Sequence, residues 1–260
     1  MGTKSKLIVW SILLLCSWLV LFLFSSARPL FSGEPITVFL AGDSTMAEKL
    51  DDKRPETGWG EKLQQLFSAD EVKVANHAKN GRSTKTFLEE KLWQQLLENV
   101  KAGDYVFIEF GHNDQAKAKS ERYTPPADFQ ANLVRFVTDV RKRKAYPVLM
   151  TPVARRRFNP SGEFYDTHGE YPDLVRRVAT DYKVPLIDML QKSERVLQKL
   201  GPEESRKLFL HLKANENSNY PNGIEDNTHF NDYGAQVMAD LAVEGIRELK
   251  LDLIRYLKPK

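Results

Sequence analysis

Three short polar turns carry the residues that could do chemistry in this chain. Each follows an apolar run, and their sequences are Gly42-Asp43-Ser44, Asn80-Gly81-Arg82 and Gly111-His112-Asn113-Asp114. A serine hydroxyl can act as a nucleophile when a base and hydrogen-bond donors lie close to it. Gly42-Asp43-Ser44 alone is equally typical of a turn whose serine only forms hydrogen bonds. The chemistry of Ser44 therefore depends on what the rest of the chain places beside it.

A base for Ser44 has to come from a distant part of the chain. Among the five histidines, His229 differs because Asp226 precedes it by three residues, just before the last predicted helix. A carboxylate at this spacing can hold the far ring nitrogen of the imidazole if the loop curls into one turn. We therefore expect a Ser–His–Asp arrangement of Ser44, His229 and Asp226.

An acyl-transfer site also needs hydrogen-bond donors directed at the developing oxyanion. The candidate donors are the backbone N–H groups of Ser44 and Gly81 and the side-chain amide of Asn113. A glycine suits such a position because it lets the backbone approach a substrate closely. Asp43 is expected to support the turn by hydrogen bonds, and His112 either contacts substrate or has a structural role.

The apolar runs before the turns are predicted to be buried strands. The first predicted strand is the apolar run 38–41, with Ile36 and Thr37 just upstream and Gly42 as its exit, and the others cover 72–78, 105–110, 146–151 and 184–188. Segments with apolar residues at helical spacing alternate with them. These are 61–67, a stretch with Leu88, Leu92 and Leu96 on one face, a stretch after Pro126, one after Tyr171, 193–200, and one from Asp232 onward. The segment 213–228 is polar and rich in Asn, and is predicted to be a long loop.

Strands that alternate with helices predict an α/β fold, here a three-layer α/β/α sandwich with a parallel sheet of about five strands. The carboxyl ends of parallel strands lie at one edge of the sheet, where open α/β sheets bind their ligands. The three polar turns would therefore meet at that edge, although they are far apart in sequence.

The first 27 residues have the features of a secretory signal peptide. Lys4 and Lys6 precede an apolar run from Leu7 to Phe24, and Ser25-Ser26-Ala27 provides small residues for cleavage. Retention of this segment as a membrane anchor is the alternative, because the run is close to the length that spans a bilayer. We expect residues 28–260 to be one exported catalytic domain, periplasmic or extracellular. Its Lys+Arg and Asp+Glu nearly balance, which gives no support for a nucleic-acid partner.

The chain resembles the SGNH (GDSL-type) hydrolase superfamily in four motifs that occur in the family's order. These are Gly42-Asp43-Ser44, Gly81, Gly111-x-Asn113 and Asp226-x-x-His229. In finer features the chain resembles the rhamnogalacturonan acetylesterase-like branch of this superfamily. These features are Gly42-Asp43-Ser44-Thr45, Gly58-Trp59-Gly60, Phe110-Gly111-His112-Asn113-Asp114-Gln115, Thr151-Pro152-Val153 with Arg155-Arg156, and Asp226-Asn227-Thr228-His229-Phe230.

This resemblance implies a flavodoxin-like sandwich and an esterase that removes acetyl groups from pectic polysaccharide without a cofactor or metal. It implies Ser44 as nucleophile, His229 as base and Asp226 as the residue that orients the base, with Ser44, Gly81 and Asn113 as the oxyanion hole. The other histidines lack metal-ligand spacing, namely His77, His168 and His211.

Basic residues flank two of the predicted turns. Arg82 follows Gly81, and Arg155 and Arg156 follow the fourth predicted strand at the same edge. A galacturonate-containing polymer is anionic, so we expect these three arginines to be candidate substrate contacts. The alternatives to a pectin acetylesterase are an acetylesterase of xylan or oligosaccharides, a lipase or thioesterase, and a sugar-binding module without catalysis.

Overall fold

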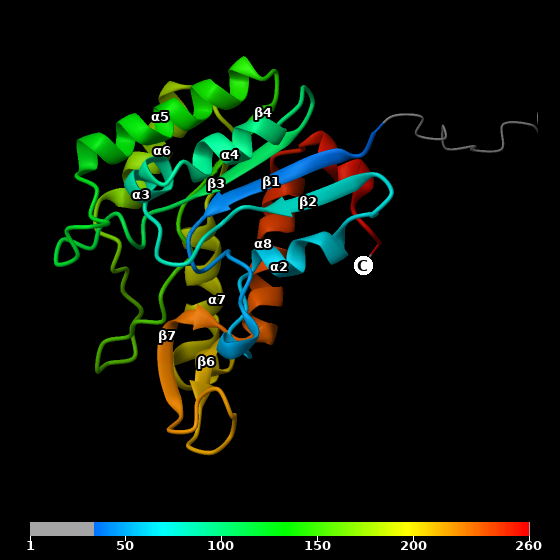
Figure 1. The fold of residues 1–260 in the computed structure, drawn as a ribbon. Coiled ribbons are helices and arrows are strands. Elements are labelled where there is room, and N and C mark those ends of the chain that lie inside the picture. The colour runs from blue at the N-terminus through cyan, green and yellow to red at the C-terminus, as the bar shows by residue number, and fades with distance from the viewer. Residues whose placement is uncertain (1–33, 260) are drawn as a thin grey trace, which may run out of the picture. The chain divides into compact units, whose positions relative to one another are not determined.

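A parallel sheet of five strands forms the centre of the protein in the computed structural model, which describes residues 34–259. The predicted leader at residues 1–27 lies outside the described residues. The strands are β1 (Ile36–Gly42), β2 (Val72–Asn76), β3 (Tyr105–Glu109), β4 (Tyr146–Met150) and β5 (Leu186–Ile187). Their order across the sheet is β2-β1-β3-β4-β5, the flavodoxin-like order. Figure 1 labels the first four of these strands.

Helices cover both faces of this sheet (Figure 1). One face packs against α2 (Gly60–Leu63), α7 (Met189–Glu204) and α8 (Asp232–Glu248). The other packs against α3 (Thr84–Glu89), α4 (Leu92–Asn99), α5 (Pro126–Lys142) and α6 (Tyr171–Asp181). The predicted three-layer sandwich is thus confirmed. Within the described residues, no helix combines the length and the apolar character needed to cross a membrane.

Strand β1 shows why the sheet is buried on both faces. Val38 and Leu40 belong to the core on the side of α8, whereas Phe39 and Ala41 belong to the core on the side of α5. Successive side chains of a strand point to opposite faces, so a strand covered on both sides must be apolar throughout. Gly42 ends this run and opens the turn that carries Ser44.

The predicted helix around Leu88, Leu92 and Leu96 is two helices. Lys91 has a left-handed backbone conformation with φ 59°, which ends α3 and starts α4 in a new direction. The apolar spacing continues across this break, so the pattern alone could not reveal it.

The predicted loop 213–228 is wrong from Ile224 onward. Residues Ile224–Phe230 form strand β7, which pairs antiparallel with β6 (Phe209–Leu212). Gly223, with φ 74°, lies in the loop of this hairpin immediately before β7. Most β7 side chains are only half-buried, so its polar sequence does not resemble a core strand. Asp226 and His229 therefore lie on a strand and not on a free loop.

Candidate active site

Ser44 lies directly after β1, at the carboxyl edge of the sheet. The turn around it is closed by the carbonyl of Asp43, which accepts hydrogen bonds from the N–H groups of Met46 and Ala47. The Asp43 side chain is buried, and its Oδ1 accepts a 3.0 Å hydrogen bond from the N–H of Thr45. Asp43 thus holds the turn as expected, and the Ser44 hydroxyl is left to face the cavity.

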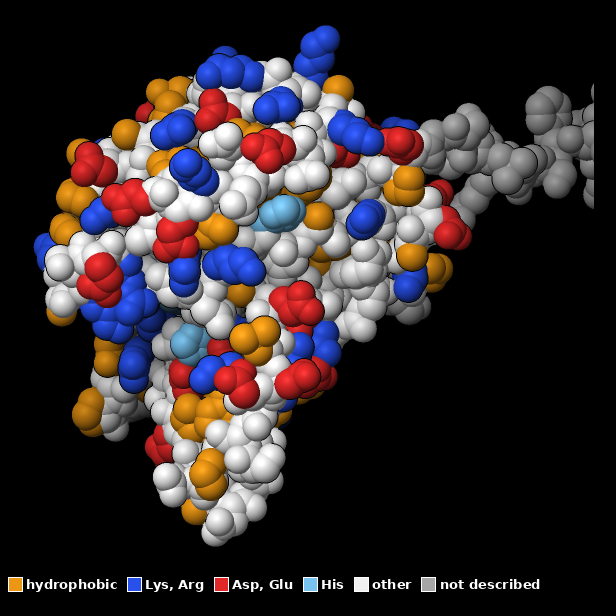
Figure 2. Space-filling model, in the orientation of Figure 1, with side chains coloured by type: hydrophobic (Ala, Val, Ile, Leu, Met, Phe, Trp, Pro, Cys, Tyr) orange, Lys and Arg blue, Asp and Glu red, His pale blue; other side chains and the backbone are white. Residues whose placement is uncertain are grey.

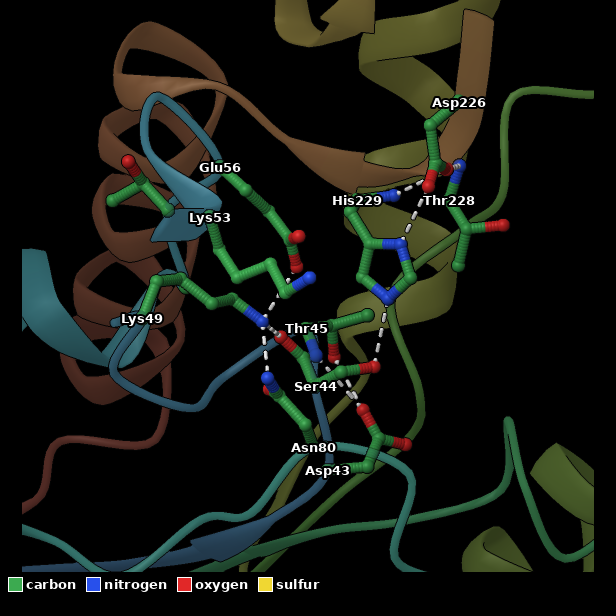
Figure 3. Close-up of polar contacts among 12 residues, drawn as sticks. Asp43, Ser44, Thr45, Lys49, Lys53, Glu56, Asn80, Asp226, Thr228 and His229 are labelled. Carbon is green, nitrogen blue, oxygen red and sulfur yellow. Dashed lines mark hydrogen bonds and ion pairs between the residues drawn. The ribbon is translucent and has the colours of Figure 1, made fainter. Parts of the chain in front are cut away.

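Ser44, His229 and Asp226 form one hydrogen-bonded row (Figure 3). The Ser44 Oγ lies 2.8 Å from Nε2 of His229, and Nδ1 of His229 lies 2.7 Å from Oδ2 of Asp226. The second carboxylate oxygen of Asp226 accepts from the N–H groups of Thr228 and His229, at 2.6 and 2.9 Å. The histidine can therefore take a proton from the serine while the carboxylate fixes its ring.

The charge of Asp226 suits this position. Burial raises the pKa of its carboxyl, but the hydrogen bonds and charge of His229 and the N–H of Thr228 outweigh burial and lower the pKa to about 2. Asp226 therefore stays ionised at neutral pH, as it must to stabilise an imidazolium.

The predicted oxyanion donors lie around the same cavity as Ser44. Gly81 has φ 75°, and a side chain there would come within 3.3 Å of Nη1 of Arg122. The Asn113 Oδ1 accepts a 3.0 Å hydrogen bond from Arg122, and its Nδ2 donates to the carbonyl of Arg82 at 2.9 Å. Arg122 thereby sets which end of the Asn113 amide is the donor.

Asp114 ties the turn of Asn113 to the turn of Gly81. Its Oδ1 accepts from the N–H and the hydroxyl of Thr84, at 2.8 and 2.6 Å. Ser83 caps α3 at the same place, with its hydroxyl accepting from the N–H of Thr86. The hydrogen bonds between Asp114 and Thr84 therefore hold the two turns that carry the candidate donors Gly81 and Asn113 next to each other.

Of the three arginines predicted to contact substrate, only Arg155 lines the cavity. Arg155 lines the cavity and donates to the carbonyl of His112 at 3.1 Å. Arg82 is not in the cavity lining and instead pairs with Glu90, at 2.8 Å. Arg156 is buried and turned away from the cavity, so its prediction as a substrate contact is wrong. It donates to Asn227 Oδ1, Ser205 Oγ and the carbonyl of Pro202.

The sequence did not reveal Lys49, which supports the nucleophile from behind (Figure 3). Its side chain is fully buried, and Nζ donates to the carbonyl of Ser44 and to Oδ1 of Asn80 at 2.9 Å. Glu56 neutralises this lysine, with Oε1 at 2.8 Å. Through its two hydrogen bonds, Lys49 links the Ser44 turn to the turn that contains Asn80 and Gly81. Nothing in the sequence around Lys49, which follows Met46, Ala47 and Glu48, indicates that its side chain is buried beneath the nucleophile turn.

The structure also contains a second aspartate–histidine pair, formed by Asp166 and His168, which the sequence analysis did not identify. The His168 Nδ1 lies 2.6 Å from Oδ1 of Asp166, and its Nε2 lies 3.1 Å from Nδ1 of His112. Burial and the charge of Arg155 hold the pKa of His112 well below its usual range, so its ring is neutral. His112 thus has structural hydrogen bonds and also lines the cavity.

Asp43, Glu109 and His112 are the residues of the described chain that come closest to a metal-binding group. One ligand atom from each lies within 4.8 Å of the others. However, Oδ1 of Asp43 and both oxygens of Glu109 already contact Thr45 or Trp59, which leaves only Oδ2 of Asp43 and Nε2 of His112 without a partner. Two buried atoms are too few to hold a metal ion.

A cavity of about 560 Å³ surrounds these groups. Its lining includes Ser44, Gly81, Asn113 and His229 together with the basic residues Lys53, Lys119, Arg122 and Arg155. Lys and Arg side chains gather along one side of a hollow in the face that Figure 2 shows. The site therefore combines a nucleophile and base with a basic wall.

Comparison with known proteins places this geometry in a family. Residues 40–237 match the GDSL-like lipase/acylhydrolase family. The chain is 46% identical over 224 residues to rhamnogalacturonan acetylesterase RhgT of Bacillus subtilis (strain 168), covering 86% of this chain and 95% of that protein. It is 36% identical over 217 residues to the probable rhamnogalacturonan acetylesterase YesY of the same organism, covering 83% and 94%.

The fold has a counterpart among solved structures. The crystal structure of Bacillus subtilis protein YxiM superposes with a TM-score of 0.72 at 24% identity, covering 84% of this chain and 58% of that one. This likeness concerns the fold, whereas the family match and the two relatives confirm the resemblance seen in the four sequence motifs. The chain belongs to the GDSL-like lipase/acylhydrolase family of carboxylic ester hydrolases.

Proposed function

We propose that this protein is a serine esterase that removes O-acetyl groups from a rhamnogalacturonan-type pectic polysaccharide. The row of Ser44, His229 and Asp226 carries the proposal, because each hydrogen bond in it is short enough for proton transfer or orientation. The relatives RhgT and YesY, named as rhamnogalacturonan acetylesterases, support the substrate class.

The reaction has two steps through an acetyl-enzyme. His229 accepts the proton of Ser44 as Oγ forms a bond to the acetyl carbonyl carbon, and the sugar hydroxyl leaves with that proton. Water then attacks the acetyl carbonyl while His229 acts as base again, and acetate is released with Ser44 restored. The N–H groups of Ser44 and Gly81 and the amide of Asn113 stabilise the oxyanion in both steps.

The basic side of the cavity supports an acidic polymer over a lipid. Lys53, Lys119, Arg122 and Arg155 line it, against the acidic groups of Glu56 and Asp226. A local positive field at this wall attracts the carboxylates of galacturonate, whereas an uncharged acyl chain gains nothing from it. The leader features support export of the enzyme to the periplasm or outside the cell, with residues 1–27 as the signal peptide.

Acetate release from acetylated rhamnogalacturonan and from acetylated xylan tests the substrate class. We expect the first to be faster, and Lys119→Ala to lower kcat/KM on it by about fivefold while sparing a neutral acetyl ester. Lys117→Ala is the matched control, because Lys117 is exposed on the same loop but does not line the cavity.

Faster acetate release from xylan would instead favour a xylan acetylesterase. Faster cleavage of a long-chain ester than of an acetyl ester would favour a lipase or thioesterase. If Ser44→Ala leaves activity unchanged, the proposed mechanism is wrong.

A further inference from the structure

One threonine hydroxyl lies between two buried carboxyl groups beneath the nucleophile. The Thr45 Oγ1 is 2.9 Å from Oδ1 of Asp43 and 2.9 Å from Oε1 of Glu109, and all three side chains are buried. A threonine hydroxyl carries a single hydrogen. It can therefore make a full hydrogen bond to only one of these oxygens, and a hydrogen on a carboxyl group completes the other contact. The arrangement favours one protonated acid.

The surroundings assign this proton to Glu109. Burial raises the pKa of Asp43, while hydrogen bonds from Thr45 and the charges of His229 and Arg155 oppose the rise. For Glu109, burial and the charge of Asp43 act together and raise the pKa to about 8, although its hydrogen bonds with neighbouring groups oppose this. Asp43 is therefore the better place for the single negative charge.

The other partners of Glu109 fit a neutral carboxyl group. Its Oε2 accepts a 2.9 Å hydrogen bond from Nε1 of Trp59, and the backbone N–H of Val153, after β4, also points to the carboxyl. The titratable groups that face it are Asp43 from the turn after β1 and the neutral His112 from the turn after β3. Among the described residues, the main groups that act on Glu109 include no cation, so only its hydrogen bonds oppose the effect of burial and of Asp43 on its pKa.

We propose that Glu109 is a positioning residue that is held protonated and orients the turn of the nucleophile. Trp59 donates to Glu109, the Glu109 hydroxyl donates to Thr45, and the Thr45 hydroxyl donates to Asp43. All donors in this row point the same way, so every contact between these four side chains has a hydrogen, and Asp43 keeps its charge in the turn of Ser44. Figure 3 shows the last contact of the row, between Thr45 and Asp43. Loss of the Glu109 proton would break the row and put a second negative charge beside Asp43.

Replacement of Glu109 by glutamine tests the proton directly. In Glu109→Gln the amide Nε2 donates to Thr45 as the protonated carboxyl does, and Oε1 still accepts from Trp59. We expect this variant to keep kcat within about threefold of wild type at pH 6. Glu109→Leu has a similar size but no polar atoms, and we expect it to lower kcat by about tenfold or more, since Thr45 and Trp59 lose their partner.

The pH dependence of unfolding separates positioning by a protonated acid from a merely structural role. In the unfolded chain Glu109 loses its proton at its ordinary pKa of 4.5, whereas in the folded protein its pKa is raised to about 8. Between these two pH values only the folded protein keeps the proton. Wild-type stability relative to Glu109→Gln should therefore fall as pH rises through this window and level off above it. The activity of the wild type should show an alkaline decline near pH 8 that the glutamine variant lacks.

Three results would overturn the proposal. The first is the same pH dependence of unfolding in Glu109→Gln and in the wild type. The second is a kcat of Glu109→Gln at pH 6 that is as low as that of Glu109→Leu. The third is a higher kcat in Asp43→Asn than in Glu109→Gln at this pH. The inference rests on the proposed function only for its activity measurement. Unfolding needs no substrate, so a wrong substrate class or mechanism would leave that measurement intact.

Discussion

The described chain holds two aspartate–histidine pairs with nearly the same bond between the partners. The Nδ1 of His229 lies 2.7 Å from Asp226, and the Nδ1 of His168 lies 2.6 Å from Asp166. Their far nitrogens differ, because His229 meets the Ser44 hydroxyl at 2.8 Å and His168 meets the ring of His112 at 3.1 Å. The side chain of His229 is 26% exposed, whereas that of His168 is fully buried.

This difference shows that a carboxylate–imidazole pair is not by itself a catalytic unit. Asp166 makes Nδ1 of His168 the protonated nitrogen, so Nε2 is an acceptor and His112 must donate to it. The buried pair thus fixes the ring of His112 and, through it, the turn that carries Asn113. The exposed pair instead leaves Nε2 of His229 free to accept the proton of a hydroxyl.

The largest expected loss of kcat follows from removing the contact between Nε2 of His229 and the Ser44 hydroxyl. Ser44→Ala and His229→Ala should each lower kcat by about 10⁴-fold or more, because either change removes the proton transfer. The double variant should be no worse than the single ones, since the two residues act as a unit. Turnover of an acetyl nitrophenyl ester measures this, and additive losses would contradict the shared role.

An intermediate effect is expected at the carboxylate of the exposed pair. Asp226→Asn should lower kcat by about 10²- to 10⁴-fold with little change in KM, because the amide no longer stabilises the imidazolium or holds the correct tautomer. Steady-state kinetics on the same ester provide the measurement. An unchanged kcat would mean that Asp226 only shapes strand β7.

The smallest catalytic effect is expected at the matched position of the buried pair. Asp166→Asn should destabilise the protein by about 1–3 kcal/mol, the usual range for loss of a charged hydrogen bond, and should change kcat by less than about tenfold. Thermal unfolding and ester hydrolysis of the same sample compare the two effects. A loss of kcat equal to that of Asp226→Asn would show that the second pair acts in catalysis.

Much of this architecture follows from local patterns that burial imposes on a sequence. A strand covered on both faces must be apolar and must end in a residue that permits a turn, which is how β1 and Ser44 could be predicted. Pairing of β6 with β7 could not be predicted in this way, because β7 is half-buried and its partner strand is selected by contacts that are distant in sequence.

The order of strands and turns, and with it the meeting of Ser44, Gly81 and Asn113 at one edge of the sheet, could be predicted from the amino-acid sequence. The sequence also marked Asp226 and His229 as a pair. The different positions of Arg155, which lines the cavity, and Arg156, which is buried, depend on partners that are distant in sequence, namely His112 for Arg155 and Ser205 and Asn227 for Arg156. The proton proposed for Glu109 likewise follows from burial beside Asp43, and burial is a property of the folded molecule alone.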